Sequence, residues 1–439
     1  MSSTWVFISF CFLALAMVFT LRTNNPTTAA TVQSDAKHHS LARSTLLLLM
    51  VKNEEQVIER MLSSGKQGAR FLFICDTGST DGTLAIVERV WRKNYRIYKT
   101  NFTNFETTRN ECNAHAHIYL KDMRSLGVSL EYVLLADADF VFVERSPQSP
   151  PSGGTGGTTF DINIIQIHAG ISGHPHNSLN MFIKYDTFIH CRYRLWTHEY
   201  LDCSAASPGN VSIGHYTHFY YIDYADGKSR PEKLTRDARL LEQWLHQVNE
   251  TDLRPRALYY LARAYEDGNQ LNKAMRTYEQ HNAVQVFTNY QFYAKYRMAL
   301  ITMQQMYEQL NSNSSSSSVS LSNADAKVEA AFWSAVIQHD GYFRQEPLYW
   351  LARYFRQRGQ LNKCIVYATA GMHLPEIDHA RMPLFLETHI QEWALREELA
   401  YCLKLKGREN ESLQHYKFIL ASVGQKLDKN TLERIKNKV

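Results

Sequence analysis

Two carboxylates, Asp137 and Asp139, interrupt an apolar run that extends from Tyr132 to Val143. The Val- and Leu-rich run predicts a strand buried on both faces of a parallel sheet. Alternate residues of a strand point to the same face, so both carboxylates can reach one hard divalent cation. Because two like charges are costly to bury, we expect them at the exposed end of the strand. Solvated aspartates that simply follow a strand are the alternative interpretation.

A second polar cluster, residues 76–83 (DTGSTDGT), follows an apolar run at 71–75 that reads as another strand. The two glycines of this cluster allow a tight turn. Asp76 and Asp81 can accept hydrogen bonds from the base or the ribose hydroxyls of a nucleotide. A capped helix start explains the same residues without any ligand.

Strands and helices alternate along the part of the chain that contains these clusters. We expect strands at 46–51, 71–75, 96–98 and 132–143, and helices at 55–62, 83–92 and 104–120. The alternation predicts a parallel sheet with helices on both faces, which binds its ligands at the carboxyl ends of the strands. Asn53 and the two aspartate clusters each follow a predicted strand end, which argues for a ligand site there.

The chain from about residue 235 shows helical periodicity and an internal repeat. Residues 258–274 align without gaps on residues 348–364, and nine of the 17 positions match. A fainter third copy surrounds residues 399–416, with its turn at Gly407. Each copy predicts a pair of helices, and such pairs stack into a solenoid because one pair alone cannot bury its apolar face.

Residues 5–21 form an uncharged apolar run of 17 residues. We therefore expect a signal-anchor at 1–22, a polar stem at 23–43 and a single-pass membrane protein that faces the lumen of the ER or Golgi. Secretion after cleavage and a cytosolic location are the alternatives. The six cysteines outside the run permit disulfides without implying them. The formal net charge of +5 includes no dominant basic tract, which argues against nucleic-acid binding.

The order and spacing of four motifs resemble those of family-2-type glycosyltransferases with a GT-A nucleotide-sugar-binding domain. These motifs are residues 49–55 (LMVKNEE), the 76–83 cluster, Arg109-Asn110 and residues 135–139 (LADAD). Residues 193–200 (YRLWTHEY) resemble the His-Glu element of a subset that carries a tetratricopeptide-like tail, and residues 225–237 resemble the basic junction before that tail.

The resemblance implies an α/β GT-A domain, Rossmann-like with a mainly parallel sheet, over residues 44–230. It also implies an all-α solenoid of tetratricopeptide (TPR)-like repeats over 235–439. The N-terminal hydrophobic anchor helix expected from the apolar run departs from the family pattern. The implied donor-binding residues are Glu54, Asp76, Asp81, Arg109, Asp137, Arg230 and Lys233. A plain basic linker explains the last two equally well, as it does His215 and His218. Asp137 and Asp139 would hold Mn²⁺ or Mg²⁺ on the donor diphosphate.

Glu199 is the candidate catalytic base and His198 its partner, or a contact to phosphate or metal. The expected reaction is metal-dependent, inverting transfer from a nucleotide sugar, such as a UDP-sugar, to a protein, glycan or lipid acceptor. It needs charge neutralisation on the departing diphosphate and a base for the acceptor proton. The alternative is a non-catalytic TPR-type interaction protein with an inactive nucleotide-sugar domain. A nucleotidyltransferase would show a glycine- and Arg/Lys-rich loop where residues 52–55 (KNEE) stand.

Overall fold

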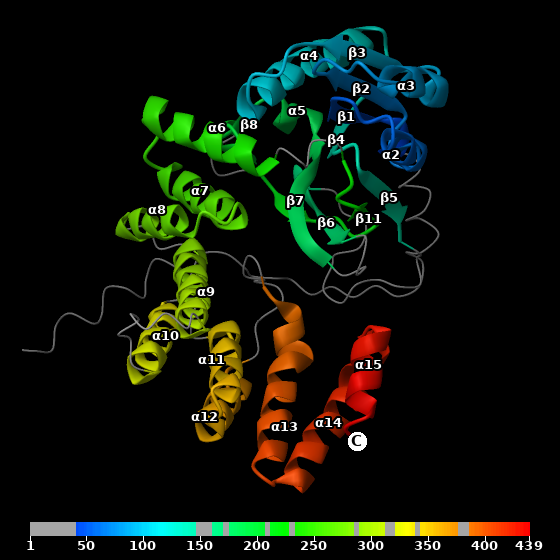
Figure 1. The fold of residues 1–439 in the computed structure, drawn as a ribbon. Helices are drawn as coiled ribbons and strands as arrows, with labels where there is room; N and C mark the ends of the chain where they lie inside the picture. Colours follow the sequence, from blue (N-terminus) through cyan, green and yellow to red (C-terminus); the bar gives the residue numbers. More distant parts are fainter. Residues whose placement is uncertain are drawn as a thin grey trace, which may run out of the picture.

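A computed structural model describes most of the chain. The described residues are 41–145, 160–169, 175–206, 211–227, 233–284, 289–311, 321–338, 343–375 and 386–439. Within them, a mixed sheet with flanking helices is followed by a succession of helices that pack in pairs (Figure 1). The strands lie between residues 45 and 223, and the paired helices begin at residue 233. The limits expected for the two domains stay a prediction.

The large sheet has nine strands within the described residues, in the order β3-β2-β1-β4-β7-β6-β11-β5, with β10 paired to β6. Its strands are β1 (Thr45–Val51), β2 (Phe71–Asp76), β3 (Tyr95–Lys99), β4 (Tyr132–Ala136), β5 (Phe140–Glu144), β6 (Ile162–Ala169), β7 (Pro175–Lys184), β10 (Ile213–His215) and β11 (Phe219–Asp223). A separate pair joins β8 (Arg192–Arg194) to β9 (Tyr200–Asp202). The helices of this part are α2 (Ile58–Gly65), α3 (Thr83–Trp91), α4 (Phe105–Ser125) and α5 (Tyr185–Phe188).

The sheet is mixed, with more parallel than antiparallel pairings. Strands β1, β2, β3 and β4 run parallel to one another, as the alternating pattern predicts. Beyond β4 the order changes, because β7 runs antiparallel to both β4 and β6, and β5 runs antiparallel to β11. β6 runs parallel to β10 and β11, so five of the eight pairings described for this sheet are parallel.

The single strand expected at residues 132–143 is two strands, which corrects that prediction. β4 lies inside the sheet and β5 lies at its end, and residues 137–139 form the turn between them. The side chain of Asp137 is 47% exposed, whereas Leu134 is fully buried. The chain leaves the sheet at the aspartates because a buried strand cannot accommodate an unneutralised carboxylate.

The helices after residue 233 pack mainly as consecutive pairs (Figure 1). They are α6 (Lys233–Gln247), α7 (Arg254–Asp267), α8 (Leu271–Ala283), α9 (Asn289–Asn311), α10 (Leu321–Val336), α11 (Glu346–Gln357), α12 (Leu361–Met372), α13 (Leu395–Leu405), α14 (Glu409–Val423) and α15 (Lys429–Lys436). The two clear copies of the internal repeat are the pairs α7–α8 and α11–α12, and the faint copy is α13–α14. Gly407 has a φ of 75° in the turn between α13 and α14. The predicted TPR-like helix pairs are confirmed.

The expectation of a single-pass membrane protein is corrected by the helices that the structure describes. None of them combines the length and the apolar character needed to cross a bilayer. The expected anchor at residues 1–22 lies outside the described residues.

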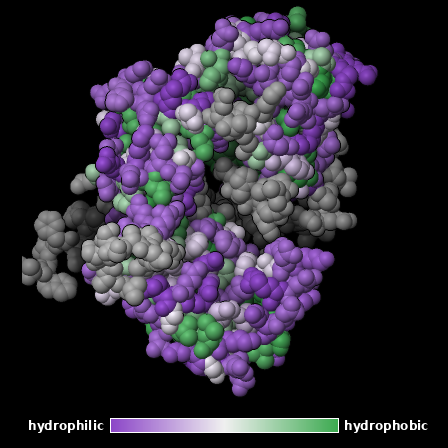
Figure 2. Space-filling model, viewed as in Figure 1, coloured by the Kyte–Doolittle hydropathy of each residue, from purple (hydrophilic) through white to green (hydrophobic). Residues whose placement is uncertain are grey.

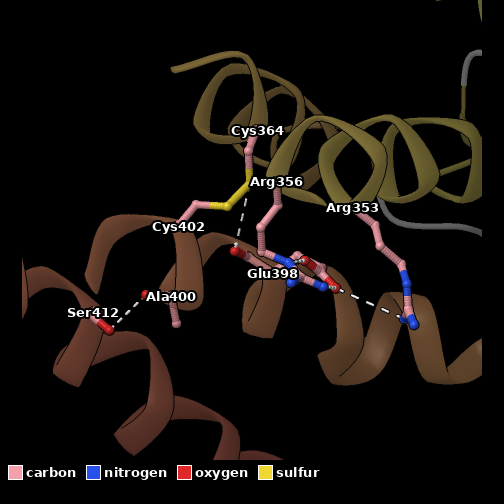
Figure 3. Close-up of a disulfide and its surroundings, with 7 residues drawn as sticks. All are labelled: Arg353, Arg356, Cys364, Glu398, Ala400, Cys402 and Ser412. Atoms are coloured by element: carbon pink, nitrogen blue, oxygen red, sulfur yellow. Dashed lines mark hydrogen bonds and ion pairs between the residues drawn. A yellow bond between two sulfur atoms is a disulfide. The ribbon is translucent and has the colours of Figure 1, made fainter. Parts of the chain in front are cut away.

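Three disulfides link the six cysteines of the described residues, namely Cys75–Cys112, Cys191–Cys203 and Cys364–Cys402. The third joins α12 to α13, so it connects two successive helix pairs (Figure 3). Beside it, Arg356 of α11 donates to Glu398 of α13 at 2.6 Å. Covalent and ionic links therefore reinforce the same interface.

Removing this disulfide should destabilise the repeats. A Cys364→Ala/Cys402→Ala variant loses a cross-link with a sequence separation of 38 residues, which predicts a loss of about 3–4 kcal/mol in the free energy of unfolding. Urea unfolding followed by far-UV circular dichroism measures the change. Arg408→Gln is the control, because its exposed ion pair with Glu411 contributes little. A double variant as stable as the wild type would contradict the prediction.

Candidate functional site

A pocket of about 740 Å³ lies where the carboxyl ends of β1, β2 and β4 meet the start of α6. Parallel strands bring their carboxyl ends to one edge of a sheet, which explains why loops distant in sequence converge there. The lining residues are Met50, Val51, Lys52, Asn53, Glu54, Thr77, Phe102, Phe105, Arg109, Asp137, Ala138, Asp139, Thr197, His198, Glu199, Gly227, Lys233, Arg236 and Asp237. Charged side chains of both signs dominate this lining.

Arg109 of α4 lies at the centre of the charged groups. Its Nε donates to Glu199 Oε1 at 2.7 Å, and its Nη2 donates to Asp137 Oδ1 at 3.0 Å. Burial acts to lower the pKa of Arg109, but the charges of Glu199 and Asp137 outweigh burial and raise it. The guanidinium therefore stays charged and holds two of the predicted site residues in place.

Asp76 and Asp81 stabilise the loops at the edge of the sheet. Asp76 Oδ1 accepts a hydrogen bond from Ser79 N at 2.9 Å, and Asp81 Oδ1 accepts one from Thr83 N at 3.0 Å. The other oxygen of Asp81 accepts from Glu55 N at 3.3 Å, which joins the loops after β1 and β2. Neither aspartate lines the pocket. Their contact with a nucleotide stays a prediction.

Glu54 and Asp139 face the same point on the backbone, at Gly227. Gly227 N donates to Asp139 Oδ2 at 3.3 Å. A Cβ at Gly227 would lie 3.2 Å from that oxygen and 3.5 Å from Glu54 Oε2. The two carboxylates thus converge, but the residues that the structure describes contain no group of three or more His, Cys, Asp or Glu side chains able to hold a metal ion. The expectation of a metal-binding protein is not supported by any such preformed site.

His198 lies at the boundary between the pocket and the helical repeats. Its ring stacks on Tyr260 of α7 with centroids 4.0 Å apart and an interplanar angle of 6°. Its Nε2 is 3.6 Å from Asp237 Oδ2. Burial, followed by the positive charges of Lys233 and Arg256, lowers the pKa of His198 to about 3. The imidazole is therefore neutral at physiological pH.

The first turns of α6 complete the pocket with three residues, Lys233, Arg236 and Asp237. Lys233 is one of the predicted residues, whereas Arg230 lies outside the described residues. Asp237 is buried and accepts hydrogen bonds from Thr197 Oγ1 at 3.1 Å and from Arg236 Nε at 3.2 Å. The sequence contained a signal for the two missed residues, since positions three and four after Lys233 share its helix face.

Phe102 and Phe105 also line the pocket and were not predicted, because aromatic residues are usually interpreted as part of a core. Their rings meet edge to face with centroids 5.0 Å apart. His215 and His218, considered as ligand contacts, are not among the lining residues.

Comparison with known proteins finds distant likenesses to solved structures alone. No family model matches the chain, and no curated protein matches it. Solved structures that resemble it are TPR-type repeat proteins. The thermophilic TPR protein TTC0263 of Thermus thermophilus is 14% identical, and the likeness covers 48% of this chain and 94% of that one, with a TM-score of 0.31.

Two further solved structures resemble the chain at similarly low identity. MamA from Desulfovibrio magneticus RS-1 is 15% identical, with 47% of this chain and 89% of that one covered and a TM-score of 0.29. YrrB, described as a TPR protein with an unusual peptide-binding site, is 12% identical, with 42% and 82% covered and a TM-score of 0.26. At these scores the likenesses carry no argument about activity.

The resemblance to family-2-type glycosyltransferases is corrected by these findings. No family model and no curated protein matches the chain, so nothing in these comparisons supports the GT-A assignment. Short aspartate- and glycine-containing turns at strand ends recur across α/β folds, and a shared fold feature does not imply a shared function. Here Asp76 and Asp81 accept hydrogen bonds from the segment after β2, and Asp81 also accepts one from the loop after β1.

The neutral state of His198 predicts its titration. Its NMR signal, assigned by comparison with a His198→Asn variant, should not shift between pH 8 and 5 and should begin to move only near pH 3. An unfolded histidine binds a proton near pH 6.5. Since the unfolded chain takes up this proton and the folded chain does not, the free energy of unfolding should fall as the pH drops from about 6.5 toward 3. Titration near pH 6.5 would contradict the described burial.

Proposed function

We propose that this protein is a TPR-type interaction protein whose helical repeats bind a peptide or protein partner. The observation that carries the proposal is an aromatic–arginine pair that recurs on the first helix of two helix pairs. Tyr260 and Arg263 of α7 align with Trp350 and Arg353 of α11 in the internal repeat. All four side chains are partly exposed, while the residues between them are buried.

Aromatic and arginine side chains are enriched among the residues that contribute most to binding between proteins. The guanidinium of Arg353 lies 5.4 Å from the centre of the Trp350 ring, so the two side chains form one contact surface. Much of the face shown in Figure 2 is hydrophilic, with small separate hydrophobic areas. The proposed partner is therefore a polar peptide with a few anchoring side chains rather than a large apolar surface.

Peptide selection tests this proposal. Short random peptides displayed on phage are selected against the full chain, and the Kd of each enriched peptide is measured by fluorescence anisotropy. Trp350→Ala should weaken binding about tenfold, or ~1.4 kcal/mol. Trp333→Ala is the matched control, because Trp333 is 42% exposed but lies on α10, the second helix of its pair. Failure to enrich any peptide, or equal losses for the two variants, would count against the proposal.

We propose that the pocket beside the repeats binds the nucleotide part of a nucleotide sugar. Arg109, Lys233 and Arg236 supply positive charge for a diphosphate. Mg²⁺ or Mn²⁺ stays part of this proposal, since Mg²⁺ is commonly held by one or two carboxylates together with substrate phosphates. Glu54 and Asp139 would supply those carboxylates, and the ion would neutralise charge on the diphosphate.

A catalytic role for the pocket is the second candidate, favoured by the placement of Glu199. Its carboxylate is 13% exposed, lines the pocket and is oriented by Arg109. It would remove a proton from an acceptor hydroxyl during transfer of a group from the nucleotide-activated donor, with the neutral His198 beside it. The reaction would balance by releasing the nucleoside diphosphate as the leaving group.

Calorimetry with UDP, with and without MgCl₂ or MnCl₂, tests the pocket. Arg109→Gln should weaken UDP binding at least tenfold, because it removes a positive charge and releases Glu199 and Asp137. Arg89→Gln is the control, since it removes the same charge from an exposed pair with Glu59 outside the pocket. Unchanged affinity in Arg109→Gln would exclude the ligand from this pocket.

Release of UDP from a panel of UDP-sugars separates binding from catalysis. Glu199→Gln keeps a hydrogen-bond acceptor for Arg109 but removes the base, so it should abolish release while keeping UDP affinity within about threefold. A wild type that binds UDP and releases none from any donor would favour the interaction protein alone.

A further inference from the structure

The loop that carries His198 and Glu199 into the pocket has a strained backbone. His198 has a φ of 53°, in the left-handed region that residues other than glycine adopt rarely. Leu195, earlier in the same loop, has a φ of 84° and is fully buried in the core of the helical repeats. A strained backbone of this kind persists only where its neighbours hold it.

Arg256 of α7 holds this loop. Its Nε and Nη2 both donate to the carbonyl oxygen of His198, at 3.1 and 2.8 Å. Its Nη1 donates to the hydroxyl of Tyr290 in α9 at 2.6 Å. The rings of Tyr200 and Tyr260 lie 5.4 and 5.0 Å from the guanidinium carbon. The guanidinium is thus fixed between two helices of the repeats and binds the backbone of the loop through hydrogen bonds.

The contact of Arg256 with the His198 carbonyl also determines the position of Glu199, because Glu199 is the next residue along the chain. Rotation of His198 to the ordinary negative φ would redirect the backbone and move the Glu199 carboxylate away from Arg109. Arg109 would then lose its 2.7 Å contact and stay bound to Asp137 alone. A side chain of the helical repeats therefore determines the arrangement of charges in the pocket.

We propose that Arg256 is a positioning residue for the pocket, so that the first helix pair of the repeats forms part of the ligand site rather than a separate module. Arg256 does not line the pocket and acts through the backbone of His198. The ligand is the nucleoside diphosphate, and this part of the inference rests on the proposed function. The contact between Arg256 and the loop does not depend on the identity of the ligand, and hydrogen exchange measures its effect separately.

Two measurements on the full chain test the inference. In Arg256→Met the loop loses its hydrogen bonds, and the amides of residues 195–200 should exchange with D₂O at least tenfold faster by mass spectrometry. The affinity for UDP should fall about tenfold in Arg256→Met. Arg256→Lys should have an affinity between those of the wild type and Arg256→Met, because a single ammonium replaces a guanidinium that donates two hydrogen bonds to the same oxygen. Arg297→Met is the control, since Arg297 pairs with Glu266 away from the pocket.

A double-variant comparison separates positioning from general destabilisation. Glycine adopts a positive φ without strain, so Arg256→Met should reduce UDP affinity less than threefold in a His198→Gly background. If the wild type binds no UDP, the proposed ligand fails and hydrogen exchange alone decides the role of Arg256. Unchanged exchange of residues 195–200 in Arg256→Met would overturn the inference, as would an equal affinity loss in both backgrounds.

Discussion

The ion pairs of Arg109 are the interaction on which the pocket depends. Its guanidinium joins Glu199 and Asp137, which lie 90 and 28 residues away in sequence. Glu199 and Asp137 keep the guanidinium charged, and the guanidinium offsets the cost of burying the Glu199 carboxylate. The next residue strengthens the junction, since Asn110 exchanges two hydrogen bonds with the backbone of Tyr193, at 2.9 and 2.7 Å. One turn of α4 therefore fixes the loop between β8 and β9.

The same turn of α4 is tied to the sheet. Cys112 forms a disulfide with Cys75, the residue before Asp76 at the end of β2. Asp76 and Asp81 then close the loop that follows, and the loop after β1 is bound to it through Asn53, whose Oδ1 accepts from Thr80 N at 2.7 Å. Polar residues that resemble ligand contacts in the sequence thus form the support of the pocket rim.

The helical repeats and the sheet build the pocket together. α6 contributes Lys233 and Arg236 to the lining, Asp237 accepts from Thr197 in the β8–β9 loop, and α7 holds the backbone of His198. Leu195 of that loop is buried among the helices, so the packing of the two parts is continuous. A partner bound to the exposed face of α7 would contact the same helix that positions the loop of His198 and Glu199. The two proposed binding functions therefore share one helix.

Local patterns in the sequence were enough to predict the helix pairs and the first three strands, but they merged β4 and β5 into one strand. An apolar run such as 46–49 is buried wherever it is placed, and the repeated Leu/Ala/aromatic spacing of 258–274 and 348–364 defines a buried helix face. The same patterns indicated that polar clusters at the ends of parallel strands gather at one edge. They did not support a family assignment, since short turns at strand ends have structural uses that are independent of any ligand.

Long-range packing determines how the apolar run at 132–143 divides, and which aspartates face the pocket and which close their own loops. The division of that run depends on the pairing of β5 with β11, a strand about 80 residues later in the chain. The left-handed backbone of His198 depends on Arg256, 58 residues away. Contacts between such distant residues form only once the sheet and the helices pack, and no local pattern encodes them.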